Sequence, residues 1–209
     1  MRADTSIALV VRHSHRTIIA DYEQVLRGGL TETGKATSYE MGRRLDTRRP
    51  VHMFTSFVPR CAETTEHMAR GLADAGGTVV DIEPLPTLVK PEHTEERVWE
   101  NLQPDGDNVI DFVNRWSDGT LGEGIEEFRV FGARLWSDTV ERLLSQQDPV
   151  MHIHVTHDLS LMSLKRLLLR RPLVEADREP YLGGIGLVRT HSGVQLFIGR
   201  DKSLIEIIV

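Results

Sequence analysis

Short apolar runs alternate with amphipathic segments along most of the chain. The first run, residues 6–12, is rich in β-branched side chains and has no polar alternation, which is typical of a strand buried on both faces of a sheet. Similar runs predict further strands over residues 51–55, 78–83 and 150–156. Helical spacing predicts helices over about 33–46, 60–75 and 159–170. This alternation predicts a three-layer α/β/α sandwich with a mixed, mostly parallel central sheet.

Three remaining segments have other patterns. Residues 84–124 hold four of the nine prolines, which predicts an irregular excursion with short helical pieces. An insertion of this length is typical of a lid over a substrate site. Apolar residues recur at three- and four-residue steps from 125 to 143 and predict a long amphipathic helix. The stretch 186–209 is interpreted as strands joined by turns at 192–193 and 201–202.

Composition narrows the class of protein. The 209 residues, 40% hydrophobic and 27% charged, suit one folded domain over 1–209 and exclude a disordered chain. The net charge of -6 argues against binding to nucleic acid or to a membrane surface, so an anionic substrate needs a local cationic pocket. No apolar run approaches the roughly 20 residues of a membrane span, and no signal peptide is recognised. The single cysteine, Cys61, is interpreted as a packing residue, and we expect a cytoplasmic protein.

A cationic cluster follows the first predicted strand, in the order Arg12, His13, Ser14, His15, Arg16. Guanidinium groups match phosphate oxygens in pairs and stay charged, so the two arginines suit a phosphate pocket. Their charge would disfavour the imidazolium form of His13 and leave a neutral ring nitrogen free to attack phosphorus. Alternatively, these are surface arginines around a structural histidine.

Two more polar groups follow predicted strands. Ser56 and Arg60 stand at the start of a helix, where backbone N–H groups favour a bound anion, although both could simply cap and solvate that helix. His157 and Asp158 follow the last of the parallel strands. The histidine could donate to a phosphoryl oxygen, and the aspartate could protonate a leaving oxygen or cap the next helix.

In order and spacing these pieces resemble the histidine phosphatase superfamily, also called the phosphoglycerate mutase-like fold, over most of the chain. Its Arg-His-Gly signature is met by Arg12 and His13, with Ser14 in place of glycine. The longer signature of the acid phosphatase branch would add Arg16, although Ile18 stands where that branch has proline.

Later motifs support the same resemblance. The Leu-Thr-x-x-Gly stretch is residues 30–34, and Ser-x-x-x-Arg-x-x-x-Thr is met by Ser56, Arg60 and Thr64. The closing His-Asp of the acid phosphatase branch is residues 157–158. The motifs are therefore closer to that branch.

The resemblance implies a metal-independent phosphomonoesterase that needs no cofactor and hydrolyses a small phosphorylated metabolite through a phosphohistidine. His13 would be the nucleophile. The phosphoryl group would be held by Arg12, Arg16, Arg60 and His157. A phosphomutase of the same fold is the alternative.

The proton donor and the motif glycine are the two departures from the family pattern. The mutase branch uses a glutamate in a Leu-x-Glu pattern, and Lys90 ends the corresponding triplet here. This points to Asp158 as the donor, with Glu92 in reserve. A side chain at Ser14 would crowd the phosphate or add a hydroxyl donor, which leaves open a catalytically weak phospho-ligand-binding module.

A metal-dependent hydrolase is the competing enzyme class. The pairs His13-x-His15 and His152-x-His154-x-x-His157 have spacings seen among metal ligands, and alternate residues of a strand face the same way. Histidines flanking a sheet are more often structural, so this reading is the weaker one.

Overall fold

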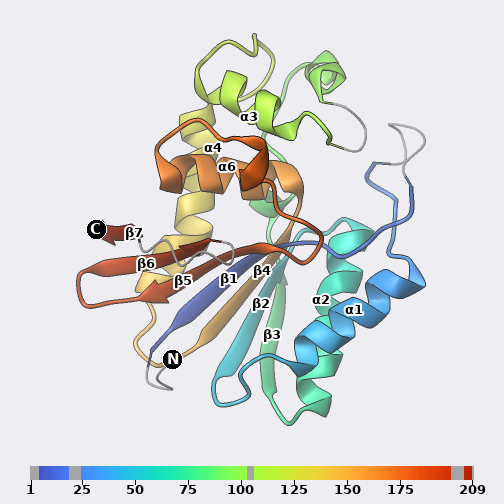
Figure 1. Ribbon diagram of the computed structural model, residues 1–209, viewed down its shortest axis with the longest axis vertical. Helices are drawn as coiled ribbons and strands as arrows, with labels where there is room; N and C mark the ends of the chain where they lie inside the picture. The colour runs from blue at the N-terminus through green and yellow to red at the C-terminus, as the bar shows by residue number, and fades with distance from the viewer. Residues whose placement is uncertain (1–4, 19–24, 103–105, 199–204, 209) are drawn as a thin grey trace.

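A computed structural model describes residues 5–18, 25–102, 106–198 and 205–208, in which seven strands form one mixed sheet (Figure 1). The strands are β1 (Ile7–Arg12), β2 (Pro50–Thr55), β3 (Thr78–Pro84), β4 (Met151–Thr156), β5 (Gly184–Arg189), β6 (Gly193–Ile198) and β7 (Ile205–Ile208). Their order across the sheet is β3-β2-β4-β1-β5-β6-β7. The first four are mutually parallel, and the C-terminal three add on antiparallel. The predicted turn at 192–193 joins β5 to β6, whereas the one at 201–202 lies outside the described residues.

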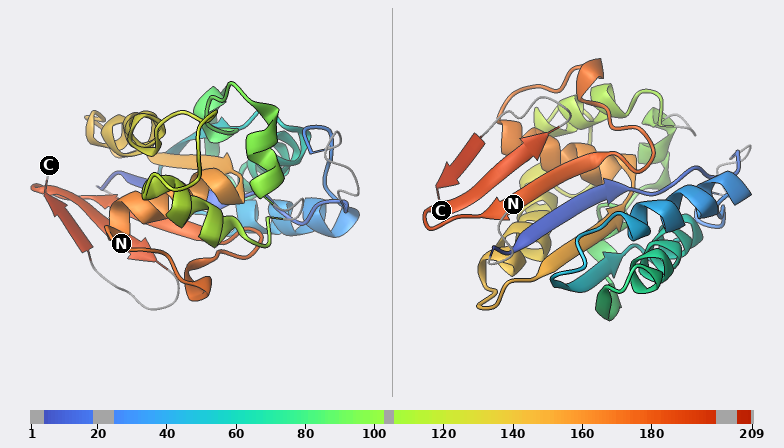
Figure 2. Two further views of the ribbon diagram at one scale, coloured as in Figure 1. Left: turned by 90° about the horizontal axis from the view of Figure 1, so that it is seen from above. Right: turned by 60° about the horizontal axis from the view of Figure 1, so that its bottom comes forward.

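Helices cover both faces of the sheet (Figures 1 and 2). One face carries α1 (Glu32–Arg43) and α2 (Pro59–Asp74), and the other carries α3 (Val109–Ser117), α4 (Phe128–Trp136) and α6 (Asp158–Leu169). The shorter elements are the helical turns η2 (Pro86–Leu88), η3 (Glu96–Asn101), η4 (Ser137–Glu141) and η5 (Glu175–Asp177) and the one-turn helix α5 (Arg142–Leu144). The predicted α/β/α sandwich is therefore confirmed. In the described residues, no helix is long and apolar enough to span a membrane.

The unbroken apolar run of β1 is explained by burial on both sides. Ile7 and Val11 belong to the core under α2, while Ala8 and Val10 belong to the larger core under α4 and α6. Successive strand residues point to opposite faces, so both parities must be apolar when helices cover both faces.

The segment 84–124 is built into the main core. Its Trp99, Phe112 and Trp116 are buried there, and α3 packs against α6. The predicted helix from residue 125 begins instead at Phe128, because the backbone N–H of Glu126 and the carbonyl of Gly124 bond to the stretch 92–95. The helical run then continues through the π-helical turn η4 to Leu144.

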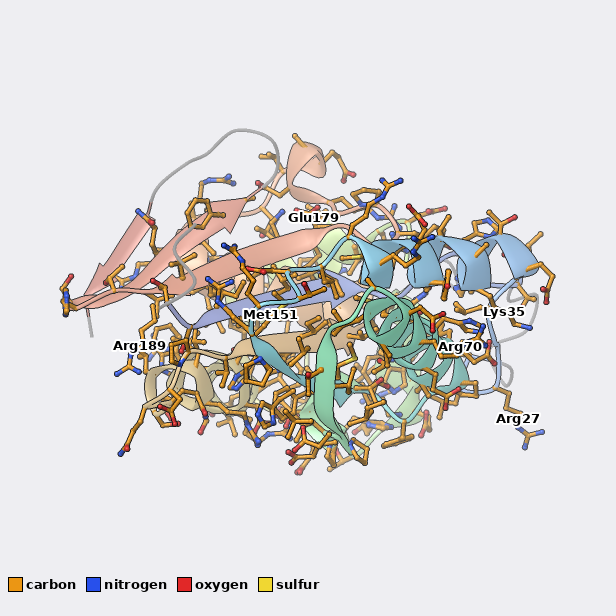
Figure 3. The ribbon with its side chains drawn as sticks, turned by 90° about the horizontal axis from the view of Figure 1, so that it is seen from below. Arg27, Lys35, Arg70, Met151, Glu179 and Arg189 are labelled. Carbon is orange, nitrogen blue, oxygen red and sulfur yellow. The ribbon has the colours of Figure 1, made fainter. Side chains whose placement is uncertain are left out.

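Three strand ends meet at one edge of the sheet. In the register Arg12 lies beside Thr156, and Thr55 lies beside Val155. The three polar motifs that follow these strands are therefore brought together, as expected for the carboxyl ends of parallel strands. Around this body Arg27, Lys35 and Arg70 mark the outer surface of the α1–α2 side (Figure 3).

Candidate active site

His13 is held in one tautomer at the end of β1. The side chain is buried, and its backbone N–H donates to the carbonyl of Thr156 at 2.8 Å. Nδ1 lies 2.8 Å from the carbonyl of Ser14, which can only accept, so Nδ1 carries the proton. Nε2 accepts from Nε of Arg60 at 3.2 Å. Burial, and then the charge of Arg60, hold the pKa of His13 well below its ordinary value, so the ring is neutral with its lone pair on Nε2.

His157 faces this ring from the end of β4. The two ring centroids are 5.5 Å apart in an edge-to-face arrangement. Nε2 of His157 shares a hydrogen bond of 2.9 Å with Oγ of Ser56, which also accepts the backbone N–H of Val58. Burial, followed by Arg60, keeps the pKa of His157 well below its usual range. Cys61 packs beside this histidine with its Sγ 3.5 Å from Nε2, and burial raises the pKa of the thiol to about 12.

Arginines surround the histidine pair. Arg12 is buried, with Nη2 2.6 Å from Oδ2 of Asp158 and Nη1 donating to the carbonyl of Glu179 at 3.0 Å. Arg60 reaches the carbonyl of Val25 as well as His13. Arg16 is buried too and donates to the carbonyl of the next residue. The structure therefore brings all three predicted arginines to one place.

A hollow of about 700 Å³ adjoins the site through Arg12 and Tyr181, which contact Asp158 and His13, although the two histidine rings are not part of its lining. Its lining includes Arg12, His15, Arg16, Asp107, Arg178 and Tyr181. The cations on this wall provide the local pocket that a chain of net charge -6 needs for an anionic substrate.

Asp158 is the first residue of α6 and is buried. Arg12 and Arg178 both contact its Oδ2, at 2.6 and 3.4 Å. Within the described part of the chain Oδ1 is buried without a hydrogen-bond partner. Burial raises the pKa of this carboxyl, and the two arginines oppose that rise. The alternative that Asp158 caps α6 is wrong, since His157 occupies the N-cap and the Asp158 carboxyl group contacts Arg12 and Arg178.

The reserve donor, Glu92, lies elsewhere. Its side chain is exposed, and its backbone N–H donates to Oε2 of Glu126 at 2.6 Å. The described contacts of Glu92 tie it to the stretch 124–126 and not to the histidine pair.

The side chain of Ser14 points toward α1. Its Oγ donates to the carbonyl of Gly34 on α1 at 2.8 Å and lies 3.0 Å from Oγ1 of Thr37. Its backbone N–H donates to Oγ1 of Thr64, the last residue of the Ser-x-x-x-Arg-x-x-x-Thr motif. The hydroxyl therefore ties the loop after β1 to α1, and Ser14 does not line the hollow, so it neither crowds the hollow nor adds a donor to it.

Sequence reasoning missed Arg178 and Tyr181, which precede β5. The guanidinium of Arg12 lies 4.5 Å from the ring centre of Tyr181, and that ring also lies 5.7 Å from the ring of His13. No local sequence pattern marks these two residues: it is the antiparallel pairing of β5 with β1 that brings the residues before β5 to the end of β1.

The histidines of the metal hypothesis are separated by the fold. His152 and His154 point to the face of the sheet that carries Phe54, at 5.2 and 4.6 Å between ring centres, while His157 joins His13. Among the residues that the structure describes, no three His, Cys, Asp or Glu side chains gather as metal ligands would.

The family is established by comparison with known proteins. The model of the histidine phosphatase superfamily (branch 1) matches residues 9–190, so the chain belongs to this superfamily. The resemblance to the acid phosphatase branch remains one of individual motifs. No curated protein matches the chain.

Solved structures share the fold at low identity. YhfR of Bacillus stearothermophilus aligns with a TM-score of 0.59 and 20% identity over 97% of this chain and 96% of that one. A phosphoglycerate mutase of Bacillus anthracis aligns at 0.61 and 14%, over 96% of each chain. A phosphoserine phosphatase of Entamoeba histolytica, with a His-to-Ala substitution, aligns at 0.57 and 13%, over 95% of this chain and 98% of that one. The phosphoglycerate mutase-like fold is thereby shown.

Proposed function

We propose that this protein is a metal-independent phosphomonoesterase that hydrolyses a small phosphorylated metabolite through a phosphohistidine at His13. One observation carries the proposal: the Nδ1–H bond to the Ser14 carbonyl leaves an unprotonated Nε2 among arginines. A neutral imidazole in a cationic, buried setting is a competent nucleophile toward a phosphate ester.

In the first step Nε2 of His13 attacks phosphorus and the ester P–O bond breaks. Arg12, Arg16 and Arg60 neutralise the charge on the phosphoryl oxygens, which is where phosphoryl transfer needs help most. The proton on Asp158 goes to the leaving alkoxide oxygen. We assign this proton to Oδ1, because both arginines contact Oδ2 and Oδ1 has no hydrogen-bond partner among the described residues.

In the second step water attacks the phosphohistidine. The Asp158 carboxylate formed in the first step takes a proton from that water, the P–N bond breaks, and Nε2 recovers its lone pair. Phosphate leaves, and the carboxyl is again protonated. His157, held by Ser56, donates to a phosphoryl oxygen through both steps.

The substrate is a small molecule that fits beside the histidine pair. The hollow of about 700 Å³ lies within the range typical of small-ligand sites. Its wall includes Asp107, which belongs to the segment 84–124 and lies 3.4 Å from Arg178. We therefore assign this segment, within a single domain, the role of a lid that selects the leaving group.

A panel of phosphorylated metabolites tests the proposal, with the wild type and His13→Ala compared in the presence and absence of a chelator. We expect the wild type to release phosphate from at least one compound with or without chelator, and His13→Ala to be inactive while its circular dichroism is unchanged. Transfer of the phosphoryl group to a second substrate molecule instead of water would identify the mutase alternative. Binding without turnover would identify a phospho-ligand-binding module.

A further inference from the structure

The segment 178–183, between η5 and β5, encloses Arg12. The carbonyl of Gly183 accepts the backbone N–H of Arg12 at 2.9 Å, and the N–H of Leu182 donates to the Arg12 carbonyl at 3.2 Å. The carbonyl of Glu179 accepts from Nη1, and the ring of Tyr181 covers the guanidinium. The position of Arg12 therefore depends on the position of this segment.

The segment has no regular structure of its own to hold it in place. It turns through a bond of 2.9 Å from the N–H of Gly183 to the carbonyl of Pro180, and Leu182 has a φ of 60°, in the left-handed region that a leucine seldom adopts. A strained, irregular loop keeps one conformation only when its surroundings impose it.

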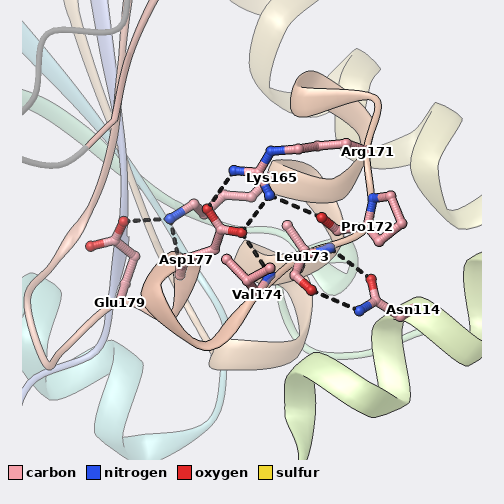
Figure 4. Close-up of polar contacts among 8 residues, drawn as sticks. All are labelled: Asn114, Lys165, Arg171, Pro172, Leu173, Val174, Asp177 and Glu179. Atoms are coloured by element: carbon pink, nitrogen blue, oxygen red, sulfur yellow. Dashed lines mark hydrogen bonds and ion pairs between the residues drawn. The ribbon is translucent and has the colours of Figure 1, made fainter.

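A buried lysine on α6 is the anchor (Figure 4). Nζ of Lys165 lies 2.7 Å from Oε1 of Glu179 and also donates to the carbonyl of Asp177. Only 1% of the Lys165 side chain is exposed. Lys165 stands seven residues after Asp158, two helical turns along the same face of α6. One helix thus fixes both the proposed acid and the loop that holds its arginine partners.

Stability alone does not explain this ion pair. Removing both ions from water costs about as much free energy as their attraction returns, and apolar pairs of similar size are often as stable or more so. What a buried pair does supply is direction, because the Lys165 ammonium is held by the carbonyl of Asp177 and donates from there to the Glu179 carboxylate. A second ion pair, between Arg171 and Asp177, lies just before this segment. Its arginine is half-exposed and bonds to Asp177 rather than to Glu179.

We propose that Lys165 is a positioning residue, which acts through Glu179 to fix Arg12 against the phosphoryl group. The proposal rests on the proposed function for its kinetic readout. The placement of the Arg12 guanidinium through Glu179 does not depend on which substrate is used.

The main test replaces the ion pair by an apolar pair, Lys165→Met/Glu179→Leu, so that neither charge is left buried alone. We expect this variant to unfold at a temperature near that of the wild type. Its kcat/KM should fall by roughly tenfold to a hundredfold, because displacing a group at the reacting centre by about 1 Å has effects of that size. Lys35→Met is the control: its exposed pair with Glu32 lies on α1, well apart from Glu179 (Figure 3), and its kcat/KM should stay within about twofold.

A double-mutant cycle shows whether the effect passes through Arg12. On an Arg12→Ala background the same pair replacement should lower kcat/KM by less than about twofold, since the guanidinium that the ion pair positions is gone. An equal loss of kcat/KM on both backgrounds, or a wild-type kcat/KM in the pair variant, would overturn the proposal.

Crystal structures separate this proposal from the proposed function. In the pair variant the Arg12 guanidinium should lie out of hydrogen-bond reach of the Glu179 carbonyl, whereas in Lys35→Met it should stay. If the wild type hydrolyses no phosphate ester, the proposed function fails, and the place of Arg12 in these crystals still decides the role of Lys165. An unmoved Arg12 would overturn it.

Discussion

The proposed nucleophile, His13, has a free lone pair on Nε2 in only one of its two neutral forms, and one hydrogen bond selects that form. The Ser14 carbonyl accepts a hydrogen bond from Nδ1–H, and Arg60 donates one to Nε2. Both contacts favour a lone pair on Nε2, and burial adds to them by disfavouring the charged ring. The carbonyl of the next residue thus selects the tautomer that the proposed mechanism needs.

Two opposed effects act on the pKa of Asp158. Burial raises its pKa, while Arg12 and Arg178 pull it down. The proposed mechanism needs such a balance, because a general acid must lose and regain a proton within one catalytic cycle.

Asp158→Asn should slow hydrolysis of an alkyl phosphate by roughly two to four powers of ten, because an alkoxide leaves poorly without a proton. A nitrophenyl phosphate has a stable leaving group, so its turnover should fall much less. Steady-state kinetics on both substrates measures the contrast. Equal losses on the two would mean that Asp158 acts only by orienting its arginines.

At the scale of elements, the site depends on how the loop after β1 is joined to α1. Gly34 packs so closely on this loop that a Cβ there would lie 2.0 Å from the carbonyl of His15. Ser14 adds its side-chain bond to Gly34 at the same contact. Residues 30–34 of the family motif therefore support the loop after β1, which carries His13.

Ser14→Ala should lower the free energy of unfolding by about 1 kcal/mol, the usual contribution of a buried hydrogen bond. Because the hydroxyl points to α1, kcat/KM on a nitrophenyl phosphate should stay within about threefold of the wild type. Urea unfolding and steady-state kinetics give the two numbers. A large loss of activity at unchanged stability would place the hydroxyl on the substrate instead.

Much of the fold was predictable because its signals are local. The apolar run of β1 and the strand-end motifs at Arg12, Ser56 and His157 follow from periodicity and from the rule that parallel strand ends gather. Arg178 and Lys165 could not be found this way, because the role of each depends on a long-range contact across the loop before β5. The prediction that the helix begins at residue 125 is wrong for the same reason. Ile125 forms a β-bridge with His93, and this long-range contact overrides the local helical pattern.

The whole molecule buries several histidines in neutral form. His152 is 1% exposed, and burial lowers its pKa from 6.5 to about 4. His154 has both ring nitrogens without a hydrogen-bond partner among the described residues, and burial holds its pKa well below the usual value. The unfolded chain binds protons at these sites more tightly than the folded one, so stability must fall as the pH drops through the window from about 6.5 to about 4.

Between about pH 7 and about pH 5 we expect His152 alone to lower the free energy of unfolding by about 2 kcal/mol. Urea unfolding at the two pH values measures this loss for the wild type and for His152→Leu, in which the dependence should be shallower by that amount. Replacing the exposed His191 by Gln is the control and should leave the slope unchanged. Identical slopes in the wild type and His152→Leu would show that the ring is not held neutral.

Covalent transfer of the phosphoryl group to His13 is the step on which the proposed function depends, and trapping the phosphoenzyme tests it. Nitrophenyl phosphate is mixed with the protein for milliseconds, the reaction is stopped in alkali, where phosphohistidine survives, and the peptides are sequenced by mass spectrometry. We expect a phosphate on His13 that acid removes, that disappears when substrate is exhausted, and that is missing from His13→Ala. Turnover with no phosphate on the chain, or with the phosphate on another residue, would contradict it.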